Sequence, residues 1–351
     1  TFQSFAASAE ISMLTVDEAH CISQWGQDFR PSYLRILDFI DSLPRRPIVS
    51  AFTATATREV KDDIAQTLRL RDPEIVITGF DRPNLYYRVE TTRRKDAFVA
   101  DYVRSHPGES GIIYCATRKN VDAVQEMLRG EDIPVARYHA GMTNEERRQS
   151  QNDFIYDTAP VIVATNAFGM GIDKSNVRYV IHYNMPQSME NYYQEAGRAG
   201  RDGLPSQCIL LFSPQDIVIN RFLLDHKEND DLDDEAADLL RARDNQRLQA
   251  MTNYCQTTGC LRNYTLRYFG EEPAEPCGSC GNCDREFEEV DMTAQAKWMI
   301  NCVAETRGHY GKGVVLNTLR GANMARLREL GAMNYRSYGQ LKDCTRDELD
   351  C

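Results

Sequence analysis

The chain has 351 residues, of which 42% are hydrophobic and 26% charged, and its formal net charge is −11. This length predicts two or three globular domains, while the apolar runs fall far short of the roughly 20 residues of a membrane-spanning helix. The acidic total argues only weakly against nucleic acid as a partner, because binding depends on local basic surface.

Short apolar runs alternate with helix-like segments in the first eighty residues. Residues 12–17, 47–53 and 75–78 are predicted strands, and residues 56–69 a predicted helix. This alternation predicts an α/β fold with a parallel sheet. The stretch at residues 81–84 (DRPN) interrupts the pattern and predicts a boundary near residues 80–85. With only about three strands before it, the first α/β unit is expected to be incomplete.

The α/β pattern resumes after Pro83. The predicted strands are residues 110–115, 135–139, 161–164, 179–183 and 209–212, and the predicted helices are residues 118–129 and 143–155. From about residue 216 the chain changes to helices and polar linkers, and a cysteine cluster follows. After residue 291 the sequence predicts a small helical region.

The first chemical signal is Asp17-Glu18-Ala19-His20, directly after the first predicted strand. In P-loop NTPases an acidic residue at this place holds the magnesium ion on the β- and γ-phosphates. A neighbouring carboxylate can orient the attacking water. We therefore expect Asp17 on the metal side of ATP and Glu18 as the base. The four residues alone equally fit an acidic helix start, where Asp and Glu are favoured.

The residues that follow, 21–26 (CISQWG) and 28–31 (DFRP), make this segment resemble closely the RecQ family of superfamily-2 helicases. The resemblance implies an aromatic-rich loop that senses single-stranded DNA, with Trp25, Phe29 and Arg30 as its working residues. The chemistry agrees, because aromatic rings stack on bases of any sequence and an arginine adds charge. The alternative is that Trp25 and Phe29 are core residues.

Further motifs follow in the order of that family. Thr53-Ala54-Thr55 ends the second predicted strand and looks like the motif that links hydrolysis to DNA movement. Residues 111–115 with Arg118 resemble the opening strand of a second RecA-like domain. His139, within residues 138–141 (YHAG), resembles a turn that contacts the DNA backbone.

The strongest resemblance lies in two blocks, residues 163–173 and 192–203. The first resembles a phosphate-facing turn; it contains Thr165, Gly171 and Asp173, of which Thr165 is assigned to DNA coupling and the other two to the nucleotide. The second contains Gln194, Arg198 and Arg201. Two arginines three residues apart fit an arginine finger that stabilises charge on the γ-phosphoryl group. The resemblance favours Arg201 as the finger and Arg198 as a supporting contact, and the alternative is a surface salt-bridge helix.

The eleven cysteines include a tight C-x-x-C-x-x-C run at Cys277, Cys280 and Cys283. With a fourth soft ligand, three such thiolates hold a structural zinc ion. Cys255 and Cys260 both qualify on spacing, and the resemblance favours Cys260. Three cysteines at this spacing also open a bacterial ferredoxin signature, but the usual nearby cysteine followed by proline is missing. Zinc is therefore expected, with an iron–sulfur cluster as the alternative.

The resemblance covers residues 11 to about 345 and implies four segments. These are the end of a first RecA-like domain (1–82), a second one (83–215), a zinc-binding module (216–290) and a partial winged-helix domain (291–351). The implied activity is ATP-dependent, magnesium-requiring 3′→5′ DNA unwinding in repair or recombination. The implied partners are single-stranded DNA, duplex junctions and single-strand-binding or recombination proteins. No membrane role is expected; the compartment would be the bacterial cytoplasm with its nucleoid, or the eukaryotic nucleus.

One departure from the family concerns the phosphate-binding loop. No Gly-x-x-x-x-Gly-Lys-Ser/Thr stretch occurs in the sequence, and that loop is the main cradle of the triphosphate. We therefore expect a fragment that hydrolyses little or no ATP alone. A DNA-binding fragment without catalytic activity is the alternative function, and a related RNA helicase is a third.

Overall fold

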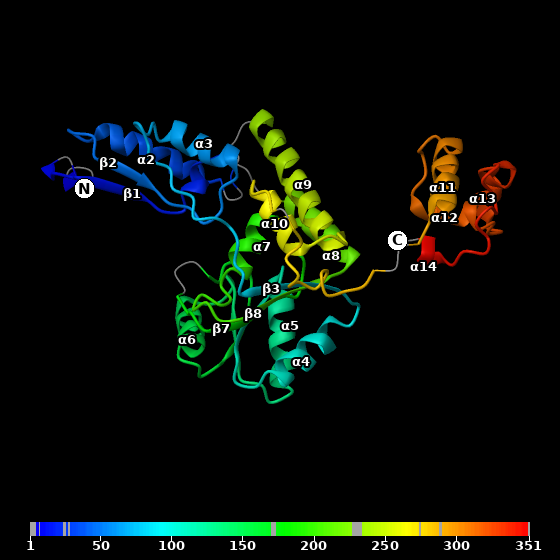
Figure 1. The fold of residues 1–351 in the computed structure, drawn as a ribbon, viewed down its shortest axis with the longest axis horizontal. Helices are drawn as coiled ribbons and strands as arrows, with labels where there is room; N and C mark the ends of the chain where they lie inside the picture. The colour runs from blue at the N-terminus through cyan, green and yellow to red at the C-terminus, as the bar shows by residue number, and fades with distance from the viewer. Residues whose placement is uncertain are drawn as a thin grey trace. The chain divides into compact units, whose positions relative to one another are not determined.

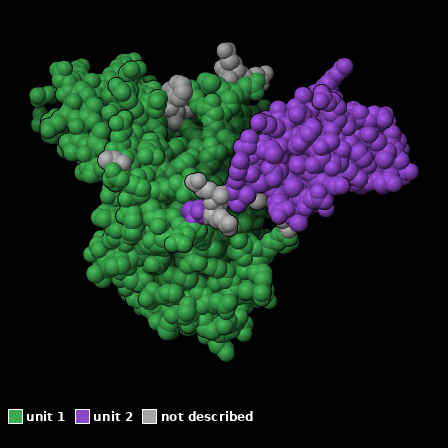
Figure 2. All heavy atoms as spheres, turned by 45° about the vertical axis from the view of Figure 1, so that its right-hand side comes forward, with its two compact units in different colours: residues 1–286 green, residues 287–351 purple. Residues whose placement is uncertain are grey.

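The computed structural model describes residues 5–6, 8–23, 26, 29–169, 173–226, 234–273, 275–287 and 290–349. The chain forms two compact units, residues 1–286 and residues 287–351 (Figure 2). Each is described by itself below.

The larger unit begins with a small parallel sheet of two strands, β1 (Met13–Val16) and β2 (Ile48–Ala51). Three helical segments pack with it, and they are η1 (Ala19–Ile22), α2 (Pro31–Ser42) and α3 (Arg58–Thr67) (Figure 1). Their apolar faces enclose a core of Val16, Ile22, Ile40, Val60 and Leu68. Because the strands are parallel, the chain leaves both at the same edge, which brings residues 17–20 close to residues 52–55.

The predicted strand at residues 75–78 is wrong. This stretch has no regular structure, and Ile75, Val76 and Ile77 are 52%, 76% and 63% exposed. A strand needs a neighbour to accept its backbone hydrogen bonds, and β1 and β2 pair only with each other among the described residues. An apolar β-branched run is therefore no guarantee of a strand.

A second, six-stranded parallel sheet follows in the order β3-β8-β7-β4-β6-β5. Its strands are β3 (Leu85–Thr91), β4 (Ser110–Tyr114), β5 (Val135–Tyr138), β6 (Val161–Ala164), β7 (Val177–His182) and β8 (Ser206–Phe212). Successive residues of a strand point to opposite faces, so Ile112 belongs to one core and Ile113 to the other. Helices cover both faces of this sheet.

One face carries α4 (Lys95–Ser105) and α5 (Arg118–Arg129), which supply Val99, Val121 and Leu128 to the core. The other face packs α6 (Asn144–Ile155) and α7 (Met189–Ala196). Two later helices, α9 (Asp234–Gln256) and α10 (Leu261–Tyr268), join that same core. Residues 234–268 therefore pack on the sheet instead of forming an isolated appendage.

The expected strands and helices of the second sheet are confirmed, but β3 was missed. Its sequence alternates, and its burial alternates with it along Leu85–Thr91. The reason is that only one face of this strand is fully buried, so no continuous apolar run marks it.

The remaining elements are helical. The larger unit contains α8 (Pro214–Asp225) before α9. The smaller unit has α11 (Thr293–Glu305), α12 (Lys312–Leu319), α13 (Ala325–Glu329), η2 (Ala332–Asn334) and α14 (Arg346–Leu349). Its core is Cys302, Leu316, Leu319 and Leu341. No helix among the described residues is long and apolar enough to cross a membrane.

Candidate functional site

The acidic pair lies in a tight turn immediately after β1. Asp17 is exposed, and its Oδ1 accepts a hydrogen bond of 2.8 Å from the backbone N–H of Glu18. Glu18 has a left-handed φ of 48°, a conformation that is uncommon for a side chain of this kind. Its carboxylate lies 3.3 Å from Nδ1 of the buried His20. The two adjacent carboxylates are thus held in different settings, one open and one paired.

A chain of hydrogen bonds runs from His20 to the second sheet. His20 Nδ1 lies 3.0 Å from Thr53 Oγ1, and this oxygen lies 3.4 Å from the backbone O and N of Thr55. Thr55 is 2% exposed, and its Oγ1 accepts a hydrogen bond of 2.9 Å from Gln194 Nε2. The structure therefore brings together Glu18, His20, both threonines and Gln194, which the sequence places up to 176 residues apart (194 − 18).

The loop after α7 carries the two arginines. Arg198 Nη1 donates a hydrogen bond of 2.6 Å to the carbonyl of Gly169. Gly169 has φ 140°, and a Cβ there would lie 2.2 Å from Arg198 Nη2. Only glycine lets the guanidinium approach the backbone this closely. Arg201 is 38% exposed and lies 3.5 Å from Asp173, whose side chain is 92% exposed.

Polar groups also gather at the carboxyl ends of β4, β5 and β6. Thr117 caps α5 by accepting a hydrogen bond from Asn120 N at 3.2 Å. Gly141 lies against both His139 and Arg118, because a Cβ at Gly141 would be 3.2 Å from His139 Nδ1 and 3.3 Å from Arg118 Nη1. Thr165 N bonds to Tyr138 O at 3.1 Å. The edge thus offers a helix N-terminus with the cationic side chain of Arg118, a combination suited to phosphate.

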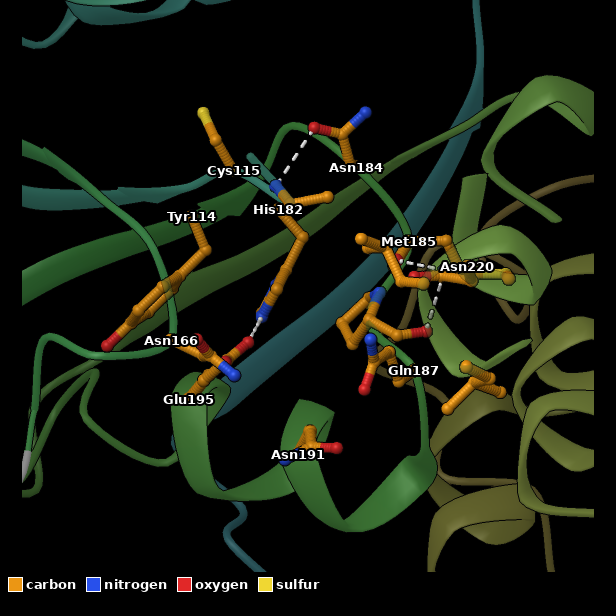
Figure 3. Close-up of a pocket in the computed structure, with 14 residues that line it drawn as sticks. Tyr114, Cys115, Asn166, His182, Asn184, Met185, Gln187, Asn191, Glu195 and Asn220 are labelled. Atoms are coloured by element: carbon orange, nitrogen blue, oxygen red, sulfur yellow. Dashed lines mark hydrogen bonds and ion pairs between the residues drawn. The ribbon is translucent and has the colours of Figure 1, made fainter. Parts of the chain in front are cut away.

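A pocket of about 350 Å³ opens at this edge (Figure 3). Its lining includes the amides Asn166, Asn184, Gln187, Asn191 and Asn220 and no lysine or arginine. Deeper in the pocket, His182 Nε2 lies 2.9 Å from Glu195. The sequence reasoning missed this pocket, because scattered amides carry no spacing signal. The only signal was the general rule that open α/β sheets bind ligands beyond the carboxyl ends of their strands.

A buried ion pair supports one wall of that pocket. Lys95 Nζ lies 2.7 Å from Asp216 Oδ2, and both side chains are at most 10% exposed. Asp216 Oδ1 accepts a hydrogen bond of 2.9 Å from Asn184 Nδ2. Asn184 Oδ1 in turn accepts a hydrogen bond of 3.1 Å from the backbone N–H of Ala116. The network fixes the turn between β4 and α5.

Four cysteines, Cys260, Cys277, Cys280 and Cys283, place their Sγ atoms within 4.8 Å of one another. A tetrahedral zinc site with Zn–S bonds of about 2.3 Å separates its sulfurs by about 3.8 Å, and the Cys277 and Cys283 sulfurs are 3.9 Å apart. Backbone N–H groups of Asn263 and Cys277 point at the Cys260 sulfur, at 3.4 and 3.3 Å. Burial opposes ionisation of the Cys280 thiol, but backbone N–H donors outweigh it and lower its pKa to about 7. The residues fit zinc.

Two of the expected site residues, Trp25 and Gly171, lie outside the described residues. Phe29 and Arg30, which were predicted to work with Trp25, are half-buried, and the Arg30 N–H donates a hydrogen bond of 2.9 Å to Cys21 O. This bond turns the chain back toward the acidic turn before α2 begins.

Four family descriptions match the chain. "DEAD/DEAH box helicase" matches residues 3–63, and "Helicase conserved C-terminal domain" matches residues 94–203. "RecQ zinc-binding" matches residues 214–284, and "RQC domain" matches residues 286–350.

Among curated proteins, the chain is similar to the "ATP-dependent DNA helicase RecQ" of Bacillus subtilis, with 43% identity over 95% of this chain and 55% of that protein. The protein of the same name from Pasteurella multocida is 36% identical over 99% of this chain and 54% of its own length. The chain thus spans about half the length of these relatives. Among solved structures, yeast Dbp5 bound to RNA and ADP BeF3 shares the fold, with a TM-score of 0.51 and 20% identity over 66% of this chain and 63% of that chain.

Proposed function

Because the chain belongs to the RecQ family of helicases, we propose that it is part of an ATP-dependent DNA helicase that moves 3′→5′ and acts in repair or recombination. The observation that carries the proposal is a chain of contacts: the Glu18 carboxylate lies 3.3 Å from His20 Nδ1, and hydrogen bonds continue from His20 through Thr53 and Thr55 to Gln194. It joins the acidic turn of the first sheet to the helix that precedes Arg198 and Arg201.

The chemistry follows from these positions. A bound magnesium ion would neutralise charge on the phosphates of ATP, and the exposed Asp17 is the residue that would hold it. Glu18 would orient the water that attacks the γ-phosphoryl group. Arg201 would stabilise the developing charge, and Arg198, held on Gly169, would support it. A change at the acidic turn would reach Gln194 through the two threonines, which is a physical route from hydrolysis to domain movement.

DNA would lie along the carboxyl edge of the second sheet. Arg118, His139 and Thr165 would contact phosphates there, assisted by the N-terminus of α5. The pocket beside them faces the same edge. Phe29, Arg30 and Trp25 would contact single-stranded DNA from the first sheet.

We infer four functional segments, residues 1–82, 83–215, 216–290 and 291–351. The third would hold a structural zinc ion through its four cysteines. That ion would supply cross-linking of the turn and no chemistry of the reaction. The fourth would add DNA contacts. Single-strand-binding or recombination proteins are the proposed partners.

ATP hydrolysis by the polypeptide 1–351 tests this reading. The sequence contains no Gly-x-x-x-x-Gly-Lys-Ser/Thr loop, so we expect little or no turnover, with or without single-stranded DNA. Arg201→Ala is the control. Turnover that depends on DNA and disappears in Arg201→Ala would show that the catalytic site is complete in this chain, and the expectation of little or no turnover would be wrong.

A further inference from the structure

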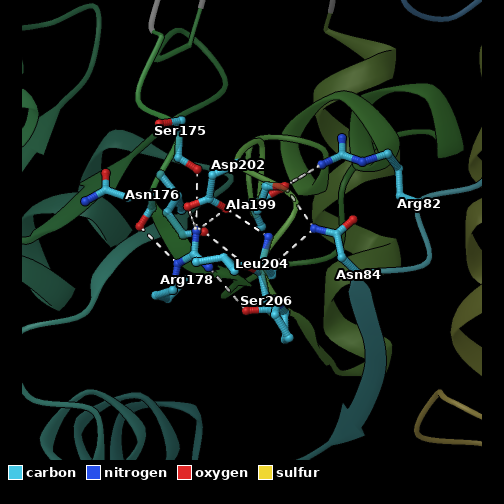
Figure 4. A network of polar contacts seen from close by, with 12 residues as sticks. Arg82, Asn84, Ser175, Asn176, Arg178, Ala199, Asp202, Leu204 and Ser206 are labelled. Atoms are coloured by element: carbon cyan, nitrogen blue, oxygen red, sulfur yellow. Dashed lines mark hydrogen bonds and ion pairs between the residues drawn. The ribbon is translucent and has the colours of Figure 1, made fainter.

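Residues 80–84 connect the two sheets and are held on two sides, and we call them the strap. On one side the strap forms hydrogen bonds to residues 197–204, which we call the arginine loop (Figure 4). Arg82 Nη1 donates a hydrogen bond of 3.3 Å to Gly197 O. Arg82 Nη2 donates hydrogen bonds of 3.1 Å to Ala199 O and 3.0 Å to Gly200 O. One side chain therefore binds three backbone carbonyls, one before Arg198 and two after it.

Helix α7 ends at Ala196, so these three carbonyls lie in the turn that follows it, and Gly200 O also accepts a hydrogen bond of 3.0 Å from Gly203 N. The C-terminal end of a helix carries partial negative charge, which favours a cation there. A guanidinium presents several N–H donors in a fixed plane, so it can satisfy several acceptors at once. A lysine at the same place could bond to them only as a single point charge.

Asn84 holds the far end of the same loop. Its Nδ2 donates 2.9 Å to Gly200 O and 3.0 Å to Leu204 O. Gly200 has φ 54°, and a Cβ there would lie 2.4 Å from Asn84 Nδ2. The turn is therefore closed directly against the strap, and only glycine leaves room for this contact.

On its other side, the strap is held by residues 216–290, which contain the four clustered cysteines and which we call the cysteine module. Arg262 lies two residues after the predicted zinc ligand Cys260, and its side chain is 7% exposed. Its Nη1 lies 2.8 Å from Asp81 Oδ1 and 2.6 Å from Arg82 O, and its Nη2 lies 2.6 Å from Leu85 O. The buried guanidinium thus bonds to backbone on both sides of Pro83.

The start of the strap is fixed by the residues after α10. The Phe80 ring stacks on Phe269 with centroids 4.4 Å apart, and the Phe80 N–H donates 2.6 Å to Glu271 Oε1. Tyr193 of α7 donates 2.9 Å to Phe80 O. Every residue of the strap therefore makes a side-chain or main-chain bond to the module or to the arginine loop; the Pro83 carbonyl does so by accepting from Arg262 Nη2 at 3.5 Å.

We propose that the cysteine module positions the arginine loop through this strap, with Arg82 as the positioning residue. The inference rests on the proposed function, which is what makes the placement of Arg198 and Arg201 matter. The proposal gives the cysteine module a second role beyond its own folding. If the module became disordered, the arginine loop would become more mobile although neither Arg198 nor Arg201 was changed.

Amide hydrogen exchange of the zinc-loaded chain tests the first link. Arg82→Met removes the donors but keeps an apolar stem. We expect amides of residues 197–204 to exchange at least tenfold faster, while the exchange of amides in β6 changes clearly less. Arg82→Lys should restore part of the protection, and the surface variant Arg104→Met should change nothing in the loop. Unchanged loop exchange in Arg82→Met would overturn the proposal. So would uniformly faster exchange across the sheet, which indicates a merely structural residue.

Removal of zinc by a chelator tests the second link. Chelation of the already folded chain should speed exchange at residues 197–204 more than in β6 in wild type, and it should add little in Arg82→Met, since the connection is already cut there. Asn84→Ala serves in the same experiment if Arg82→Met is insoluble. If zinc is shown to be lost and the amides of residues 197–204 still exchange as slowly as before, the coupling between the cysteine module and the arginine loop is refuted. Neither test uses ATP hydrolysis, so failure of the proposed activity and failure of the strap are distinguished.

Discussion

Replacement of the fourth cysteine gives the sharpest test of the metal site, because the chain offers a matched control five residues away. Cys260 contributes its sulfur to the four-cysteine cluster, whereas Cys255 is buried in the apolar core and is not among the clustered residues. A structural zinc ion contributes about 10–16 kcal/mol in small zinc-binding modules. Shared over four ligands, this is about 3 kcal/mol for each thiolate, or about a hundredfold in zinc affinity.

We therefore expect Cys260→Ala to bind zinc about a hundredfold more weakly than wild type in competition with a chelator of known affinity. Cys255→Ala should keep its zinc affinity and lose about 1 kcal/mol of folding stability, since one buried heavy atom is removed. Zinc loss in Cys255→Ala with retention in Cys260→Ala would refute the assignment of the fourth ligand. A brown protein that contains iron would refute the zinc assignment itself.

Four other changes follow from the structure. Gly169→Ala should destabilise the chain in urea by about 1.5–3 kcal/mol more than Gly108→Ala, because both have positive φ but only Gly169 faces a guanidinium with a bond to lose; equal effects would contradict this. Lys95→Met should cost about 3–5 kcal/mol by leaving Asp216 buried and unpaired, whereas Lys174→Met should cost clearly less because its partner Asp157 is 53% exposed. A double-mutant cycle of Thr55→Val and Gln194→Leu should give a coupling of about 0.5–1.5 kcal/mol, and zero coupling would remove this link from the chain of hydrogen bonds. Cys280→Ala should give insoluble protein, and a soluble, fully folded variant would contradict the role of zinc in folding.

The second sheet could be predicted from the sequence because most of its strands are buried on both faces. A stretch such as VIVA at residues 161–164 is apolar throughout, and all four residues are buried. The helix predicted at residues 143–155 is confirmed as α6, and Thr143 and Glu146 form a capping box at its start. The errors have the opposite cause. Strand β3 alternates because only one of its faces is fully buried, and residues 75–78 are apolar without a strand to pair with.

The site shows a similar division. The cysteine run and the acidic turn depend on close spacing, which a sequence displays directly. The bond between Thr55 and Gln194 joins residues 139 positions apart, and no local pattern could predict it. Asn184 and Arg82 were missed for the same reason: Asn184 accepts from a backbone N–H and Arg82 donates to backbone carbonyls of distant loops, and backbone groups leave no mark in the sequence.

Equilibrium binding to DNA tests the central claim most directly. The chain 1–351 would be titrated against a fluorescent duplex with a single-stranded 3′ tail, over a range of salt concentrations, with RNA of the same length as competitor. We predict that it binds the DNA in preference to RNA, that affinity falls steeply with salt because phosphate contacts release counterions, and that Arg118→Ala lowers the salt slope by about 1. Absence of salt-sensitive binding, or equal competition by RNA, would contradict the account.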